Sequence, residues 1–246
     1  MAKGPFHFKT FSVEQDGAAM KVGMDGIVLG SWSDVEGVKL AIDVGAGNGY
    51  VGLMLLQRMA VGSQILGVEL EPQAAEQCEE NFKAHPFTGR DARSWTGPVQ
   101  NLTESRPDLK SAADLVVSNP PFFRNKTKSL DTARNLARHD DTLPMGELAQ
   151  SAAALLKPGG RLCTIWPIDR LEEWQGWCAS AGFYDERTVM IHTMRHLPCK
   201  RFLSEWRKAP AQKAPHRTEY LTLEGKATLD FTNQYLALIR QYLKGT

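Results

Sequence analysis

The order of hydrophobic and polar positions divides the chain near residue 38. Residues 1–37 are mixed and rich in glycine, whereas the remainder alternates short apolar runs with longer stretches of helical composition. Short apolar runs bounded by turn residues are typical of buried strands. We therefore predict strands at 38–45, 63–71, 113–121, 161–166, 186–192 and 199–208. A further strand is expected near 96–99, although Gly97 and Pro98 disfavour β structure there.

Helices are predicted between most of these strands, at 49–59, 73–85, 145–156 and 169–181. Pro72 suits the first position of the second helix, and Gly182 suits the cap that ends the fourth. Strands that alternate with helices of this length predict an α/β fold with a mostly parallel sheet and helices on both faces. The last two strands are joined by a short connection, so we expect them to form a C-terminal antiparallel hairpin.

The length and composition favour a single globular domain. The chain has 246 residues, of which 42% are hydrophobic and 23% charged. We divide this domain into an N-terminal capping segment at 1–37, a core at 38–208 and a C-terminal strand and helix at 209–246. No apolar run of about 20 residues and no export signal is visible, so we expect no membrane contact and a cytoplasmic location.

Charge and cysteine content limit the classes of partner. Lysine and arginine total 29 against 28 aspartates and glutamates, but residues 119–246 hold 19 of the basic and 13 of the acidic residues. We therefore expect a polyanion, if one is bound, to contact the second half of the chain. The four cysteines form no C-x-x-C pair, and no other metal-ligand spacing is present, so no metal is expected.

The segment DVGAGNG at 43–49 follows a predicted strand and opens a predicted helix. Its glycines allow a sharp turn and a close approach to a ligand. Tyr50 stands where a dinucleotide-binding loop has its third small residue, and no phosphate-binding P-loop is present. Asp43 lies at the end of the first predicted core strand, and Glu69, a possible acceptor for ribose hydroxyls, lies at the end of the next strand. This pattern favours S-adenosylmethionine as the ligand. The alternative is a tight turn and a solvated strand end.

A second motif, NPPF at 119–122, also follows a buried strand. Ligands of open α/β sheets bind at the carboxyl ends of strands, so this motif should lie beside the glycine loop. The Asn119 side-chain carbonyl and the Pro120 main-chain carbonyl can accept both hydrogens of a planar amine. Phe122 offers a flat face for stacking. The alternative is a structural strand terminator with a buried Phe122.

Together the DVGAGNG loop, Glu69 and NPPF resemble class I S-adenosylmethionine-dependent methyltransferases that modify planar exocyclic nitrogens. That group has a Rossmann-like fold with a seven-stranded sheet. The run AMKVGMDGIVLGSW at 19–32 and the spacing of the motifs resemble, more specifically, the bacterial tRNA1(Val) (adenine-37-N6)-methyltransferase family. This resemblance covers about residues 6–243 and implies methylation of an adenine in a tRNA anticodon loop.

The family pattern implies a set of site residues in this sequence. The implied cofactor-binding residues are Asp43, Gly45, Ala46, Gly47, Asn48, Gly49, Glu69 and Asn101, the last in place of the aspartate that relatives usually have. Lys21 and Asp25 are further cofactor-binding candidates, because the segment before the first core strand can close over the cofactor or the substrate opening; the alternative is a capping loop with a salt bridge. The implied catalytic residues are Asn119, Pro120, Pro121 and Phe122. The basic cluster after the tetrad adds candidate RNA-binding residues, namely Arg124, Lys126, Lys128 and Arg138.

Other functions are compatible with NPPF. Protein glutamine N5-methyltransferases of the release-factor type and ribosomal-RNA guanine-N2 methyltransferases also act on planar amines. A catalytically silent protein that binds S-adenosylmethionine and RNA is a further alternative. The basic second half favours nucleic acid, and the segment before the first strand is too short for the N-terminal helical domain of release-factor enzymes.

Overall fold

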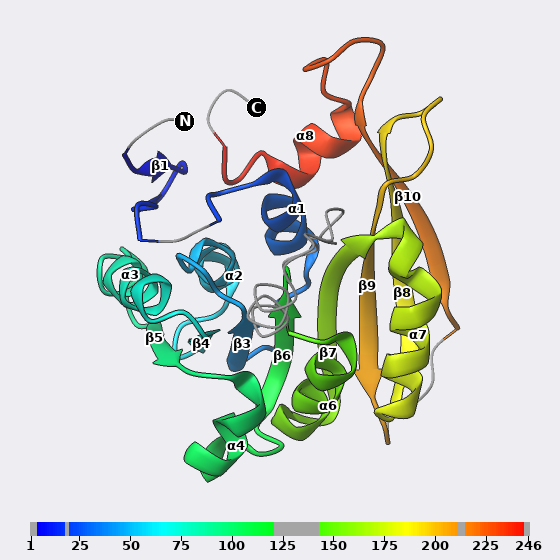
Figure 1. Ribbon diagram of the computed structural model, residues 1–246. Coiled ribbons are helices and arrows are strands. Elements are labelled where there is room, and N and C mark those ends of the chain that lie inside the picture. Colours follow the sequence, from blue (N-terminus) through cyan, green and yellow to red (C-terminus); the bar gives the residue numbers. More distant parts are fainter. Residues whose placement is uncertain (1–3, 18–19, 121–142, 211–214, 244–246) are drawn as a thin grey trace, which may run out of the picture.

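An eight-stranded sheet forms the centre of the computed structural model, which describes residues 4–17, 20–120, 143–210 and 215–243 (Figure 1). Its strands are β3 (Leu40–Val44), β4 (Gln64–Glu69), β5 (Asp91–Thr96), β6 (Ala113–Ser118), β7 (Leu156–Pro167), β8 (Phe183–Met194), β9 (Arg201–Lys208) and β10 (Arg217–Glu224). Their order is β10-β8-β9-β7-β6-β3-β4-β5. Only β9 runs antiparallel to its neighbours, which are β7 and β8. A separate pair, β1 (Phe6–His7) and β2 (Ser12–Val13), lies near the N-terminus.

Helices cover both faces of this sheet (Figure 1). One face packs against α1 (Met24–Trp32), α2 (Tyr50–Arg58), α3 (Pro72–Lys83) and α8 (Asn233–Ile239). The other face packs against α4 (Leu102–Ser105), α6 (Met145–Leu155) and α7 (Leu171–Ser180). Short 3-10 turns at Val99–Asn101, Pro107–Leu109 and Ile168–Arg170 complete the connections. Within the described ranges, none of the helices combines enough length and apolar character to cross a membrane.

Alternate residues of the strands divide between two cores, as a two-sided sheet requires. On β3, for example, Ala41 lies in the core beneath α2, whereas Ile42 lies in the core beneath α6. Both residues are fully buried. The predicted α/β fold, with a mostly parallel sheet, helices on both faces and an antiparallel hairpin (β8 and β9), is therefore confirmed.

Two sequence predictions about strands are wrong. The sheet has eight strands rather than seven, because β10 joins it through parallel pairing with β8. The first four residues of β10 are exposed, so they lack the apolar run that identifies the inner strands. The strand expected near 96–99 lies at Asp91–Thr96 instead, since Gly97 adopts φ +146° and Pro98 follows it.

Close packing of α1 on α2 depends on two glycines of the run at 19–32. A Cβ on Gly26 would lie 1.8 Å from the Tyr50 hydroxyl oxygen, and one on Gly30 would lie 3.0 Å from the Met54 sulfur. Both glycines face the same side of α1 because they are four residues apart. Their missing side chains let α1 approach the start of α2, which fixes Tyr50 beside the glycine loop.

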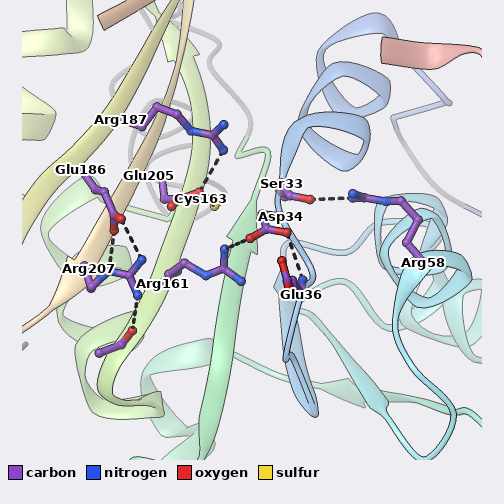
Figure 2. A network of polar contacts seen from close by, with 11 residues as sticks. Ser33, Asp34, Glu36, Arg58, Arg161, Cys163, Glu186, Arg187, Glu205 and Arg207 are labelled. Carbon is purple, nitrogen blue, oxygen red and sulfur yellow. Dashed lines mark hydrogen bonds and ion pairs between the residues drawn. The ribbon is translucent and has the colours of Figure 1, made fainter. Parts of the chain in front are cut away.

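Charged side chains join the segment after α1 to β7 and join β8 to β9 (Figure 2). Arg161 donates to Asp34 over 2.8 Å, Arg187 donates to Glu205 over 3.1 Å, and Arg207 binds Glu186 through two hydrogen bonds. The Arg187 guanidinium also lies 4.1 Å from the centre of the Trp32 ring, within the range of a cation–π contact. The contacts of Asp34 and Trp32 hold the end of α1 against β7 and β8, whereas the other two pairs join β8 to β9.

Candidate functional site

A cavity of about 620 Å³ lies at the carboxyl ends of β3, β6 and β7, against the start of α1. Parallel strands bring their carboxyl ends to one edge of the sheet, so motifs far apart in sequence meet there. The predicted site residues that line this cavity are Lys21, Asp25, Asp43, Gly45, Ala46, Gly47, Asn48, Asn119 and Pro120. The glycine loop and the start of NPPF therefore share one cavity.

The glycine loop presents bare backbone to this cavity. Gly45, Gly47 and Gly49 have φ angles of +73°, +56° and +82°, in the left-handed region that other residues rarely adopt. A Cβ on Gly45 or Gly47 would meet no atom within 4 Å, whereas one on Gly49 would lie 2.7 Å from the Phe82 ring. The first two glycines thus leave space beside the main chain that a ligand can fill, and the third allows packing against α3.

The Asp43 carboxyl is buried at the end of β3, with 2% of the residue exposed. Its Oδ2 accepts a hydrogen bond of 2.9 Å from the Gly52 N–H. Burial raises the pKa of this carboxyl to about 7, the nearby charge of Glu69 adds to the rise, and the bond from Gly52 opposes it. Asp43 is therefore a carboxyl whose charge is costly without a positively charged or hydrogen-bonding ligand.

The half-buried Glu69 carboxylate holds the glycine loop from the neighbouring strand. It accepts from the Gly47 N–H over 2.8 Å and from the Glu71 N–H over 3.0 Å. Each carboxylate oxygen has a second lone pair, so Glu69 can accept further hydrogen bonds from a ligand. Gly49 and Glu69 lie next to the described cavity lining rather than in it. Asn101 is exposed at the end of the 3-10 turn after β5, apart from that lining.

Asn119 presents an unpaired acceptor beside this loop. Burial raises the pKa of the Tyr50 hydroxyl, and a hydrogen bond from the Asn119 side chain acts in the opposite direction. Because only the amide nitrogen of asparagine can donate, the oxygen remains for another donor. Among the described residues, the buried Asn119 Oδ1 has no hydrogen-bond partner. A buried acceptor of this kind costs free energy unless a ligand satisfies it.

Six predicted site residues lie outside the described residues. They are Pro121, Phe122, Arg124, Lys126, Lys128 and Arg138. Of the NPPF motif, the structure therefore describes Asn119 and the buried Pro120.

The predicted residues of the N-terminal segment make ion pairs at the cavity. Lys21 lies 3.7 Å from Asp16, and Asp25, in the first turn of α1, lies 3.1 Å from the Arg201 Nε at the start of β9. The second pair joins α1 to the antiparallel part of the sheet. The positive charge of Arg201 therefore reaches the cavity from the amino end of β9, whereas the other strands bring their carboxyl ends there.

The sequence analysis missed several residues that line the cavity. They include Met20, Met24, Tyr50, Asp169, Arg170 and Arg201. Asp169 and Arg170 follow β7, so the rule on carboxyl ends of parallel strands could have found them. Met20 and Met24 are 43% and 40% exposed, so two apolar side chains of this cavity are open to solvent. No cluster of three or more His, Cys, Asp or Glu side chains that could hold a metal ion occurs among the residues described.

Comparisons with known proteins agree with the resemblance seen in the motifs. The family model described as methyltransferase small domain matches residues 34–169. The tRNA1(Val) (adenine(37)-N6)-methyltransferase of Porphyromonas gingivalis is 37% identical over 87% of this chain and 84% of its own length. The protein of the same name from Trichodesmium erythraeum is 36% identical over 99% of this chain and all of its own.

Solved structures support the fold. A predicted O-methyltransferase from Agrobacterium tumefaciens has a TM-score of 0.66 and 19% identity, covering 89% of this chain and 96% of its own. NSun6 from Pyrococcus horikoshii has a TM-score of 0.56 and 18% identity, covering 77% of this chain and 53% of its own. At such low identity these likenesses show the fold alone, whereas the relatives above 30% identity confirm the family expected from the motifs. The chain belongs to the methyltransferase small-domain proteins and, among them, to the tRNA1(Val) (adenine(37)-N6)-methyltransferase family.

Proposed function

We propose that the protein transfers a methyl group from S-adenosylmethionine to the exocyclic nitrogen N6 of an adenine in tRNA. The names of the relatives give the specific target as adenine 37 of tRNA1(Val), and we propose the same target here. The observation that carries the proposal is the Asn119 Oδ1, which has no hydrogen-bond partner in the described part of the chain and shares a cavity with the open glycine loop.

The residues present fit S-adenosylmethionine. Gly45 and Gly47 leave room beside the main chain for a bulky ligand, and Glu69 can accept hydrogen bonds from ribose hydroxyls. The buried Asp43 carboxyl favours a ligand that carries positive charge. When bound, S-adenosylmethionine supplies a methyl group on a sulfonium, which is already activated for transfer.

Asn119 and Pro120 would position the amine that accepts this methyl group. The adenine amino nitrogen is a weak nucleophile because its lone pair is delocalised into the ring. Hydrogen bonds from its two N–H groups to Asn119 Oδ1 and the Pro120 carbonyl oxygen would favour a more tetrahedral nitrogen and stabilise the positive charge that develops on it. Both acceptors directly follow the last residue of β6, so the sheet would orient them before the reaction.

Basic residues at the same edge suit an RNA substrate. Arg170 and Arg201 line the cavity, so they would lie close to the phosphates of a nucleotide whose base enters it. Arg207 and Lys208 end the antiparallel β9, so they lie at the opposite edge. There they bind Glu186 and the Leu156 carbonyl oxygen. The structure thus divides the basic second half of the chain into a part at the cavity and a part away from it.

Labelled S-adenosylmethionine tests this function directly. An unmodified tRNA1(Val) transcript, ribosomal RNA and a release factor are offered separately, and the product is hydrolysed to nucleosides or peptides. We expect label in 6-methyladenosine at position 37, and no label in a transcript that carries guanine there. Label in methylguanosine or methylglutamine, or in none of the three substrates, would overturn the proposal in favour of one of the alternative functions.

A further inference from the structure

A second cavity, of about 280 Å³, adjoins the first. Met24, Asp25 and Arg201 line both, so the ion pair between Asp25 and Arg201 stands where the two cavities meet. The second cavity lies between α1 and the ends of β7, β8 and β10, on the same edge of the sheet as the glycine loop. The proposed cofactor and amine sites use none of its other lining residues.

The wall of the second cavity is apolar and carries one aromatic ring. Ile165, Ile191 and Leu223 form part of it, and Phe231 adds a ring. The Phe231 backbone forms a β-bridge with Glu224 at the end of β10, and its ring lies 5.2 Å from the ring of Tyr235. The buried Tyr235 in turn donates a hydrogen bond to the Met24 sulfur. Phe231 is therefore held in place rather than free to collapse into the cavity.

Polar groups lie at the rim of this apolar wall. Thr193 offers a hydroxyl, and Glu224 accepts from the Leu229 N–H through Oε1, which leaves its other oxygen for a ligand. Lys200 is exposed beside Arg201, which pairs with Asp25, so the lysine adds a positive charge at this end of the cavity. An apolar wall with hydrogen-bond acceptors and a cation at its rim fits a nucleobase whose phosphate stays at the surface.

We propose that the second cavity binds a base that neighbours the methylated adenine in the RNA strand. This inference rests on the proposed function, because adjacent nucleotides would then occupy adjacent cavities. The Phe231 ring provides a stacking surface, and Glu224 can accept from an amino group on the edge of the base. Lys200 and Arg201 contribute positive charge next to the phosphate that joins the two nucleotides.

Abasic substitutions in the RNA test this assignment. Full-length tRNA1(Val) is assembled by ligation with an abasic nucleotide on the 5′ or the 3′ side of adenine 37. We expect one of the two substitutions to lower kcat/KM by about 5- to 100-fold, the range of a lost base–aromatic stack. Phe231→Ala should cause a similar loss with intact tRNA, and the abasic RNA should then cause little further loss.

Matched variants guard against a general loss of structure. Phe231→Leu keeps most of the apolar volume but removes the flat ring. In this variant too, the abasic RNA should cause little further loss of kcat/KM. Leu229→Ala alters a neighbouring side chain that is 73% exposed and outside the cavity lining, and should change neither rate nor coupling. The affinity for S-adenosylmethionine, measured by calorimetry, should stay within about twofold in all three variants.

The outcomes separate this inference from the proposed function. The protein could methylate adenine 37 while the abasic RNA and the Phe231 substitution each lower kcat/KM by a factor that does not depend on the other. That result would overturn the proposed role of the second cavity and leave the proposed function intact. Weaker binding of S-adenosylmethionine by Phe231→Leu would assign the second cavity to the cofactor and would also overturn its role as a base site. If no tRNA is methylated, the affinity for the same RNAs is measured by fluorescence anisotropy. An abasic nucleotide that weakens binding to the parent protein but not to Phe231→Ala supports the base site, and equal weakening in both proteins overturns the base site.

Discussion

The substitution Asp43→Asn should change how the stability of the protein depends on pH. Burial, together with the charge of Glu69, raises the pKa of the Asp43 carboxyl from 3.8 to about 7 against the opposing bond from Gly52. The native state therefore holds this proton more tightly than the unfolded chain does. Its contribution to stability is fully present below about pH 4 and is lost as the pH rises through about 7.

The size of the effect follows from the two pKa values. Between pH 5 and pH 8 the free energy of unfolding should fall by about 2 to 3 kcal/mol because of Asp43. The asparagine side chain of the variant cannot ionise, yet its carbonyl oxygen can still accept the hydrogen bond from the Gly52 N–H. The variant should therefore gain stability relative to the parent protein as the pH rises, although other groups change the stability of both.

Urea unfolding of both proteins at pH 5 and pH 8, without S-adenosylmethionine, measures this difference. The free energy of unfolding of the variant minus that of the parent should be about 2 to 3 kcal/mol greater at pH 8 than at pH 5. Contributions from carboxylates that do not interact with Asp43 cancel in the comparison, provided that the m-values agree. An advantage that is the same at both pH values would refute the reasoning about the burial of Asp43.

Two further substitutions test the packing and the charge network. Gly26→Ala puts a methyl group against the buried Tyr50 hydroxyl and should lower the free energy of unfolding, measured in urea, by about 1 to 3 kcal/mol. The control Gly176→Ala lies in a helix with open space around it and should be neutral or slightly stabilising in the same assay. Glu186→Gln removes the negative charge and one of the two oxygens that accept hydrogen bonds from Arg207, and should cost about 1 to 3 kcal/mol at pH 7. Because those bonds lower the pKa of Glu186, this cost should shrink as the pH falls below about 4.5, and a cost independent of pH would contradict that interpretation.

The strands were predictable where the chain is apolar and bounded by turns. β3, β4 and β6 are inner strands with side chains buried on both faces, so each one is a short continuous hydrophobic run in the sequence. The strand expected within 209–246 could not be placed at Arg217–Glu224 from the sequence, because an edge strand needs no such run and the first four residues of β10 are exposed. β5 was misplaced because its polar residues gave a weaker signal than the Gly97-Pro98 turn that follows it.

The candidate site was predictable to the extent that it uses the ends of parallel strands. The glycine loop after β3 and Asn119 after β6 meet in one cavity, as the topology requires. Arg201 could not be placed from its local sequence, since it reaches the cavity from the start of an antiparallel strand. The second cavity joins α1 to Phe231, about 200 residues away, so only the fold reveals it.

The central claim is that Asn119 holds the amine that receives the methyl group, next to a cofactor site that does not depend on it. Single-turnover methylation of tRNA1(Val) and calorimetric binding of S-adenosylmethionine, compared between the parent protein and Asn119→Ala, test that claim most directly. We predict a loss of about 100-fold or more in the rate of methyl transfer, with the affinity for S-adenosylmethionine nearly unchanged. A rate close to that of the parent, or a parallel loss of cofactor binding, would contradict the account.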